Sequence, residues 1–418
     1  MIQRPEIKPI GMPRIPHYTT RSTEVGAPLY SLHNSSQGVV RVSFVFRAGT
    51  SYQSAPFSAS TVVNTLSEGT QNHSGREIAE SLDFLGSYYD ANIDRDWAVV
   101  TFCSLKKFAA ETLDIAEEVI LRPTFPEKEI RSYCAKRKEQ LYVQRSKPDQ
   151  LSREVFGRAL FGEEHPYGIT SSEESYDDIT PTILRDFYLA HYNSASAFAV
   201  ICGDFGEEEE RRVAEILEGL PSGTMPKRNI PEPTPTPLVR EHIEGAVQSS
   251  IKIGLPLFPR THPDFIPMQI LATALGGYFG SRLMQNLRER NGYTYGAYAA
   301  MINLDRSGYF VMSADVAGDH TDDAIGEMFG ELERIAYEPM SEEELELVRK
   351  TIVGDALRVF DGPFGAADVT IENIQNGERN DYTERFLAEV DTITPEKLRE
   401  VAERYLQKNR CVVTIIGQ

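Results

Sequence analysis

Two stretches decide the fold: residues 179–203, ITPTILRDFYLAHYNSASAFAVICG, and residues 393–417, ITPEKLREVAERYLQKNRCVVTIIG. In each, Thr-Pro is followed by apolar residues at helical spacing and then by a β-rich run ending in glycine. Thr as N-cap and Pro in the first turn predict a helix start, and FAVICG and VVTIIG predict strands. The stretches match at a constant offset of 214 residues (393 minus 179). We interpret this match as a duplication. Chance recurrence of Thr-Pro helix starts is the alternative, and the similar order of elements around both stretches argues against it.

A proline-rich segment separates the two copies. Residues 221–237, PSGTMPKRNIPEPTPTP, contain six prolines in seventeen residues, which favours an extended, polyproline-like conformation. We predict an N-terminal domain over 1–220, a linker over 221–237 and a C-terminal domain over 238–418.

The same order of elements is predicted in both halves: strand, helix, strand, three helices, strand. Strands are expected near 39–47, 97–104, 248–254 and 293–312, and helices near 57–67, 107–121, 127–145, 264–275, 321–336 and 341–360. This order predicts an α+β fold with two homologous domains, each a largely antiparallel sheet with helices packed on one face.

Charge and composition exclude several classes of function. The chain carries 43 Lys and Arg against 62 Asp and Glu, a net charge of −19, which disfavours nucleic acid and anionic membrane surfaces as partners. We see neither a signal peptide nor an apolar run of the roughly twenty residues that a membrane span needs. The four cysteines form no C-x-x-C pair and lie mostly in apolar runs, as reduced core residues do. We therefore expect a cytoplasmic protein.

Local catalytic motifs are missing from the sequence. The eight histidines form neither H-E-x-x-H nor H-x-x-E-H, in which two imidazoles on one helix face hold one zinc. Glu163-Glu164-His165 is predicted to be a solvated turn. Residues 275–281, LGGYFGS, match no phosphate-binding loop, and no G-x-S-x-G nucleophile elbow occurs.

Residues 281–295, SRLMQNLRERNGYTY, form the most specific stretch. The pattern predicts a helix that Asn291-Gly292 ends with a left-handed residue, followed by a strand. Arg288 in the last helical turn and Tyr295 in the strand would then converge on one acceptor, as a cationic fork and a phenol. The alternative is an arginine neutralising a helix C-terminus beside a core tyrosine.

These residues resemble the pitrilysin-like family of inverted-motif zinc peptidases, which includes insulin-degrading enzyme, the mitochondrial processing peptidase and the respiratory-complex core proteins. The resemblance covers roughly residues 39–418. Besides 281–295 and the two Thr-Pro helices it includes Glu68-Gly69-Thr70, Leu85-Gly86-Ser87, Phe125-Pro126 and His165-Pro166-Tyr167-Gly168. It implies the same two-domain α+β architecture.

The sequence departs from the family where zinc would bind. Counting back from Gly69-Thr70, the family's H-x-x-E-H falls on Ser60-Thr-Val-Val63-Asn64, and its third ligand falls on or beside Gln140, with Glu139 the only nearby carboxylate. Serine, asparagine and glutamine are weak neutral donors, and valine cannot take a proton. We therefore expect this chain to bind no metal and to carry no catalytic residue of its own.

The resemblance also implies a role for such a chain. In part of the family, one chain carries zinc and a second, similar chain supplies an arginine and a tyrosine, spaced as Arg288 and Tyr295 are here, that reach the substrate at the partner's zinc. We expect a heterodimer with a zinc-bearing homologous subunit that acts on peptide substrates, and no activity of this chain alone. A structural or assembly protein without proteolytic role is the alternative. An autonomous hydrolase whose site residues are distant in sequence is a third possibility.

Overall fold

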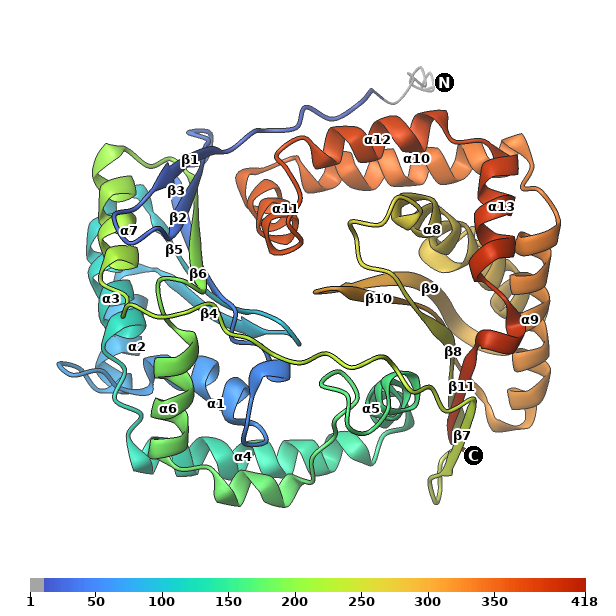
Figure 1. Cartoon of the computed structure of the whole chain (residues 1–418), viewed down its shortest axis with the longest axis horizontal. Coiled ribbons are helices and arrows are strands. Elements are labelled where there is room, and N and C mark those ends of the chain that lie inside the picture. Colours follow the sequence, from blue (N-terminus) through green and yellow to red (C-terminus); the bar gives the residue numbers. More distant parts are fainter. Residues whose placement is uncertain (1–10) are drawn as a thin grey trace, which may run out of the picture.

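The computed structural model describes residues 11–418, which form two β-sheets (Figure 1). The first sheet has the order β1-β2-β6-β3-β5-β4, with β1 (Thr19–Ser22), β2 (Pro28–His33), β3 (Val39–Phe46), β4 (Tyr88–Ile93), β5 (Ala98–Leu105) and β6 (Ala197–Gly203). The second has the order β7-β11-β8-β10-β9, with β7 (Leu238–His242), β8 (Gln248–Leu257), β9 (Thr294–Leu304), β10 (Ser307–Ala317) and β11 (Val412–Gly417).

Helices follow the strands in both halves. The N-terminal half contains α1 (Ser58–Thr65), α2 (Gly75–Leu85), α3 (Ala109–Leu121), α4 (Glu127–Arg145), α5 (Pro148–Phe161), α6 (Pro181–His191) and α7 (Glu207–Glu218). The C-terminal half contains α8 (Phe265–Ala272), the π-type helices η5 (Thr273–Gly277) and η6 (Met284–Arg290), α9 (Thr321–Tyr337), α10 (Glu342–Val359), α11 (Pro363–Gln375), α12 (Tyr382–Thr392) and α13 (Pro395–Tyr405). Among the described residues, every helix is too short or too polar to cross a lipid bilayer.

The pairing of the strands confirms the predicted fold class. Both sheets are antiparallel except for one parallel pair each, β2 with β6 and β7 with β11. The two parallel pairs involve the last strand of each half, so they occupy equivalent places. The two halves thus repeat one α+β arrangement.

The helices α6 and α13 begin as the Thr-Pro pattern predicts. The side-chain oxygens of Thr180 and Thr394 accept hydrogen bonds from the backbone N–H groups of Ile183 and Lys397, and proline follows each threonine. Strand β6 then lies buried on both faces, with every residue of the strand buried. This explains its uninterrupted apolar sequence, because a strand covered on both faces loses the usual alternation with polar residues.

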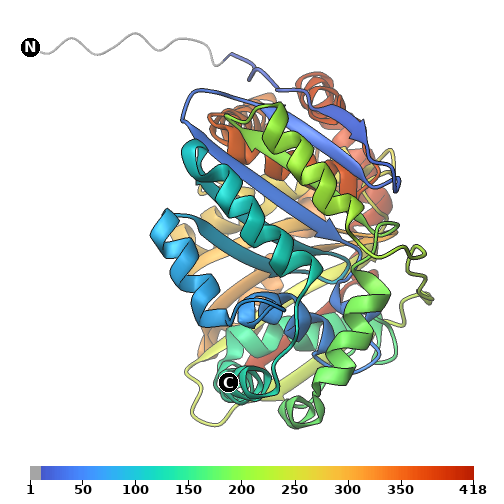
Figure 2. The same ribbon diagram turned by 90° about the vertical axis from the view of Figure 1, so that its left-hand side faces the viewer.

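One face of each sheet carries the helices of its own half. In the N-terminal half, α1, α3, α6 and α7 pack over the sheet, as Figure 2 shows, around a core that includes Phe44, Leu113 and Leu184. In the C-terminal half, α8, α9 and α13 pack in the same way around Ile253, Met312 and related residues.

The second face of each sheet is covered in part by a helix from the other half (Figure 1). Helix α11 places Ala367 and Ile371 against Phe198 and Cys202 of β6. Helix α5 packs on β8 and β11, where Phe156 approaches Gly254 so closely that a Cβ there would lie 2.9 Å from the ring. Each half therefore contributes one helix that packs on the sheet of the other half. The prediction placed helices on one face of each sheet and did not include this second layer.

Residues 221–237 contain no helix or strand and run from the first half to the second (Figure 1). The loop that follows α5 differs from its prediction. His165 is only 3% exposed, and its Nδ1 accepts a hydrogen bond from the backbone N–H of Tyr167 at 3.0 Å. The expected solvated turn at 163–165 is therefore wrong for the histidine, because the loop folds inward to place Tyr167 between the halves.

Candidate functional site

Arg288 lies in the last turn of η6, which ends abruptly. Gly292, just beyond the helix, has φ of +67°, the left-handed conformation that glycine adopts without steric cost. The backbone N–H groups of Gly292 and Tyr293 donate to the carbonyls of Arg288 and Leu287, at 3.2 and 2.8 Å. The predicted Asn-Gly stop is thus confirmed, and the chain turns directly into β9.

The guanidinium of Arg288 keeps most of its hydrogen-bonding capacity. It lies 4.8 Å from the centre of the Phe279 ring, and its Nε is 3.4 Å from Oε1 of Glu289. The side chains of Arg288 and Glu289 are 39% and 46% exposed, and an exposed ion pair between sequence neighbours contributes little. Arg288 is therefore partly ordered by an aromatic ring and still able to bind another group.

A β-bulge turns Tyr295 outward. The register between β9 and β10 shifts between Ala314 and Val316, so that Tyr295 and Gly296 together lie opposite one residue. The Thr294 hydroxyl fixes this bulge, since it accepts from the N–H of Gly296 at 3.1 Å and donates to the carbonyl of Asp315 at 2.7 Å. Tyr295 is 90% exposed. The alternative of a core tyrosine is therefore wrong, and the bulge turns the phenol away from the core.

Arg288 and Tyr295 flank the turn over residues 291–293, at the sheet edge formed by β9. Within residues 11–418, no hydrogen bond or ion pair joins these two side chains to each other. Their convergence on one acceptor stays a prediction. Both groups are donors, so the edge can recognise a carbonyl or another electron-rich oxygen.

The positions of the family's zinc motif lie on two neighbouring helices. Ser60, Val63 and Asn64 are on α1 and Gln140 is on α4, and these helices pack together. The Asn64 amide donates to the carbonyl of Ser60 at 2.8 Å, while Oε1 of Gln140 accepts from Arg137 at 3.1 Å. Val63 is fully buried. Ser60, Asn64 and Gln140 thus each make a side-chain hydrogen bond to a residue three or four positions away in the chain.

The chemistry of these residues fits zinc poorly. Zinc sites in proteins use imidazole, thiolate or carboxylate ligands, and these positions offer one hydroxyl, two amides and a valine. Among residues 11–418, no group of three or more His, Cys, Asp or Glu side chains is arranged to hold a metal ion. That the chain binds no zinc stays a prediction, which its metal content tests.

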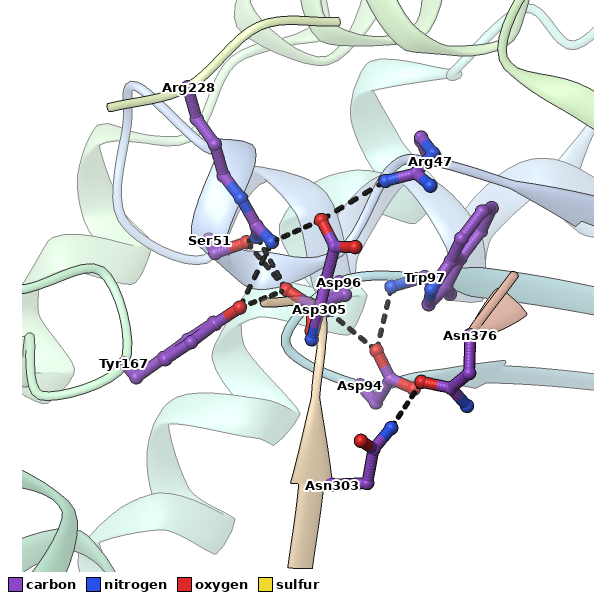
Figure 3. A network of polar contacts seen from close by, with 10 residues as sticks. All are labelled: Arg47, Ser51, Asp94, Asp96, Trp97, Tyr167, Arg228, Asn303, Asp305 and Asn376. Atoms are coloured by element: carbon purple, nitrogen blue, oxygen red, sulfur yellow. Dashed lines mark hydrogen bonds and ion pairs between the residues drawn. The ribbon is translucent and has the colours of Figure 1, made fainter. Parts of the chain in front are cut away.

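A buried polar network joins the two halves, and Arg228 from the 221–237 segment lies at its centre (Figure 3). The guanidinium forms ion pairs with Asp96, in the turn between β4 and β5, and with Asp305, in the turn between β9 and β10, the latter at 3.0 Å. The side chains of Arg228 and Asp96 are 8% and 5% exposed. One cation of the linker thus binds one carboxylate from each half.

Further contacts from Tyr167, Asp305 and Arg47 close this network. The Tyr167 hydroxyl donates to Oδ1 of Asp96 and accepts from Arg228, both at 2.9 Å, and the backbone N–H of Asp305 donates to Asp96 at 2.8 Å. Burial, with Asp96 beside it, raises the pKa of the Tyr167 phenol. Arg47 pairs with Asp305 at 3.1 Å. A cavity of about 260 Å³ lies beside these residues and is lined in part by the Asn303 and Asn376 amides.

Sequence reasoning missed this network. Its members come from distant segments, and Arg228 is one of several charged residues within a proline-rich segment. The His165-Pro-Tyr167-Gly motif was the available signal, because the hydroxyl of a tyrosine that is buried usually finds a hydrogen-bond partner. The structure supplies that partner as Asp96.

Family models match both halves of the chain. "Insulinase (Peptidase family M16)" matches residues 32–167, and "Peptidase M16 inactive domain" matches residues 178–352. An uncharacterized zinc protease of Rickettsia bellii is 24% identical over 293 residues, covering 68% of this chain and 69% of that protein. One of Mycobacterium tuberculosis is 22% identical over 361 residues, covering 84% and 82%.

Solved structures share the fold over almost the whole length. The peptidase M16 inactive domain from Pseudomonas fluorescens has a TM-score of 0.87 at 23% identity and covers 96% of this chain and 98% of that one. A protease from Helicobacter pylori has the same TM-score at 15% identity, covering 97% and 100%. With matches to both domains of the family, the chain belongs to peptidase family M16, the pitrilysin-like family that its motifs resemble.

Proposed function

We propose that this chain is the non-catalytic, substrate-positioning subunit of a heterodimeric zinc peptidase that cleaves peptides in the cytoplasm. The observation that carries the proposal is an outward-facing Tyr295 close in sequence to an Arg288 that has no strong ion-pair partner. The zinc-motif positions of the same chain hold Ser60, Val63 and Asn64. A chain with donors for a substrate carbonyl and no ligands for zinc needs a partner that supplies the metal.

The roles of the two residues follow from their chemistry. A zinc ion in the partner would activate the attacking water. Arg288 and Tyr295 would donate hydrogen bonds to the oxygen of the scissile carbonyl, which orients the peptide and stabilises the negative charge that develops on that oxygen. Removing one such donor typically lowers kcat by about 10²–10³.

The test pairs this chain with a homologous chain that contains H-x-x-E-H, preferably one encoded beside it. We expect cleavage of an unstructured fluorogenic peptide by the mixture and by neither chain alone, with substoichiometric zinc in this chain after dialysis. Arg288→Ala should lower kcat of the mixture by about 10²–10³ while the two chains still associate.

Arg290→Ala provides the matched control, since Arg290 is exposed in the same helical turn and the charge change is identical. Equal turnover of the Arg288 and Arg290 variants would contradict the proposed role. Complex formation without cleavage of any peptide would favour the alternative of a structural or assembly protein.

A further inference from the structure

Lys252 occupies an unusual place for a lysine, in the middle of the second sheet. It lies on β8 directly opposite Ser313 of β10 and Thr414 of β11, and Ser313 in turn lies opposite Tyr298 of β9. Its neighbours Ile251 and Ile253 belong to the helix-covered core, so Lys252 faces the opposite side of the sheet. These four side chains form one row across four strands, which we call the Lys252 row.

The ammonium group of Lys252 is buried without a carboxylate. The residue is 5% exposed, and its Nζ donates to the Ser313 hydroxyl at 2.9 Å and to the Tyr298 hydroxyl at 3.4 Å. In residues 11–418, no Asp or Glu oxygen lies within 4.0 Å of this nitrogen. Buried lysines are normally paired, because an unpaired charge is expensive to remove from water. The row therefore lacks its counter-charge.

The row also has hydrogen-bond donors left over. An ammonium group has three donors and no acceptor, so both hydroxyls accept from Lys252 and keep their own hydrogens free. The Thr414 hydroxyl, opposite Lys252, is fully buried and has no hydrogen-bond partner. Several donors around one positive charge suit an anionic oxygen ligand.

Asp315 is the closest acidic residue along β10 on this face. It lies two residues beyond Ser313, is exposed, and pairs across the sheet with Ser250 rather than with Lys252. Its charge weakens the attraction of the row for any anion without neutralising Lys252 through direct contact. Replacing Asp315 should therefore strengthen anion binding by the row, whereas replacing Lys252 should weaken it.

The place of the row indicates what binds there. Tyr298 and Tyr295 are three residues apart on the edge strand β9, which is about 10 Å at the rise of a strand. Tyr298, on the edge strand, is 47% exposed, whereas Ser313 and Lys252 behind it are 3% and 5% exposed, so the row meets solvent at Tyr298. An extended peptide whose carbonyl lies at Arg288 and Tyr295 would present a group about three residues away to the Lys252 row.

We infer that the Lys252 row binds a carboxylate of the peptide substrate, either the C-terminal carboxylate or an Asp or Glu side chain. The inference rests on the proposed function, since it takes the peptide to lie along β9. It assigns this chain a specificity role: peptides with a carboxylate about three residues from the positioned bond are favoured over neutral ones.

The test measures peptide binding to the isolated full chain, so that it depends on neither the partner nor cleavage. The probes are three fluorescein-labelled, unstructured ten-residue peptides followed by anisotropy: one with a free C-terminal acid, its C-terminal amide, and the amide with one internal Glu. We expect the acid, the Glu peptide or both to bind about tenfold to a hundredfold more tightly than the neutral amide. The two charged peptides distinguish the sources of the carboxylate.

Variants tie this preference to the row. Lys252→Met should abolish it, Asp315→Asn should strengthen it, and Lys350→Met should leave it unchanged, since Lys350 lies on the distant helix α10 and the charge change is the same. Tyr298→Phe and Ser313→Ala remove single hydroxyls and should reduce the preference even if Lys252→Met folds poorly.

Equal affinity for all three peptides, or a preference that survives these row variants, would overturn the inference. If Arg288→Ala loses cleavage but keeps the preference for charged peptides, the carboxylate site is distinguished from the positioning role of Arg288 in the proposed function.

Discussion

At the scale of single residues, three thiols are held in the neutral form by the core. Burial raises the pKa of Cys134 and Cys202 to about 11 and that of Cys411 to about 12, from the ordinary value of 9.0. Arg41 beside Cys202 opposes this effect without cancelling it. All three residues are 7% exposed or less, whereas Cys103 is only partly buried.

These pKa shifts predict that the free energy of unfolding decreases at high pH. Each folded-state pKa lies above the unfolded value, so the stabilisation from keeping the thiol neutral is complete below pH 9 and is lost as the pH rises through about 11 to 12. In the native chain at pH 8.5, iodoacetamide should modify Cys103 before the three buried thiols, as peptide mass spectrometry would show. Modification of Cys411 as fast as Cys103 would contradict this expectation.

Tyr295 shows why one residue's environment could not be predicted from the sequence. Strict alternation along β9 puts Tyr295 on the same face as Ala297 and Ala299, which are buried in the helix-covered core. The bulge adds one residue and reverses that assignment for Tyr295. Gly296 and the hydrogen-bonding Thr294 are its sequence signals, but both are common in regular strands as well.

At the scale of secondary-structure elements, the two Thr-Pro helices allow a matched experiment. Thr180→Ala and Thr394→Ala each remove a side-chain acceptor from a helix N-terminus, and each should lower the free energy of unfolding by about 1 kcal/mol. Denaturant titration measures both. The corresponding Thr→Ser variants keep the acceptor and should stay close to wild type, and an equal loss in the serine and alanine variants would contradict the capping role.

Elements that follow local rules were predictable, and those that depend on distant partners were not. The caps of α6 and α13 and the strands β6 and β11 follow from neighbouring residues. Helices α5 and α11 differ, because their apolar residues face a sheet of the other half. Periodicity indicates that a helix has an apolar face but not which surface will cover it.

At the scale of the whole molecule, the Arg228 network fixes the two halves to one another. Arg228→Met leaves the buried Asp96 without its cation and Asp305 paired with Arg47 alone, and removing one partner of a buried ion pair typically costs about 3–5 kcal/mol. We expect a loss of that order in denaturant unfolding and a larger radius of gyration in small-angle scattering. Lys227→Met is the control, since Lys227 is exposed next to Arg228. A stable, unexpanded Arg228 variant would show that the halves are held by packing alone.

Part of the candidate site could be predicted from the sequence. The residues Arg288 and Tyr295 and the absent zinc ligands at Ser60 and Asn64 are visible in the sequence, because each lies within a short motif. The Lys252 row and the Arg228 network are not, because their members meet only when strands from several segments are aligned.

Because α5 and α11 each pack on the sheet of the other half, the first sheet stays partly uncovered while the chain is being synthesised on the ribosome. The N-terminal sheet is complete once β6 ends at Gly203, yet Ala367 and Ile371 of α11 cover its second face only after some 160 further residues (363 minus 203) have been added. Until then the nascent chain exposes Val45, Phe198 and Cys202, an apolar surface that invites aggregation or chaperone binding. Neither half completes its core by itself, so α11 must be translated before the final folding step.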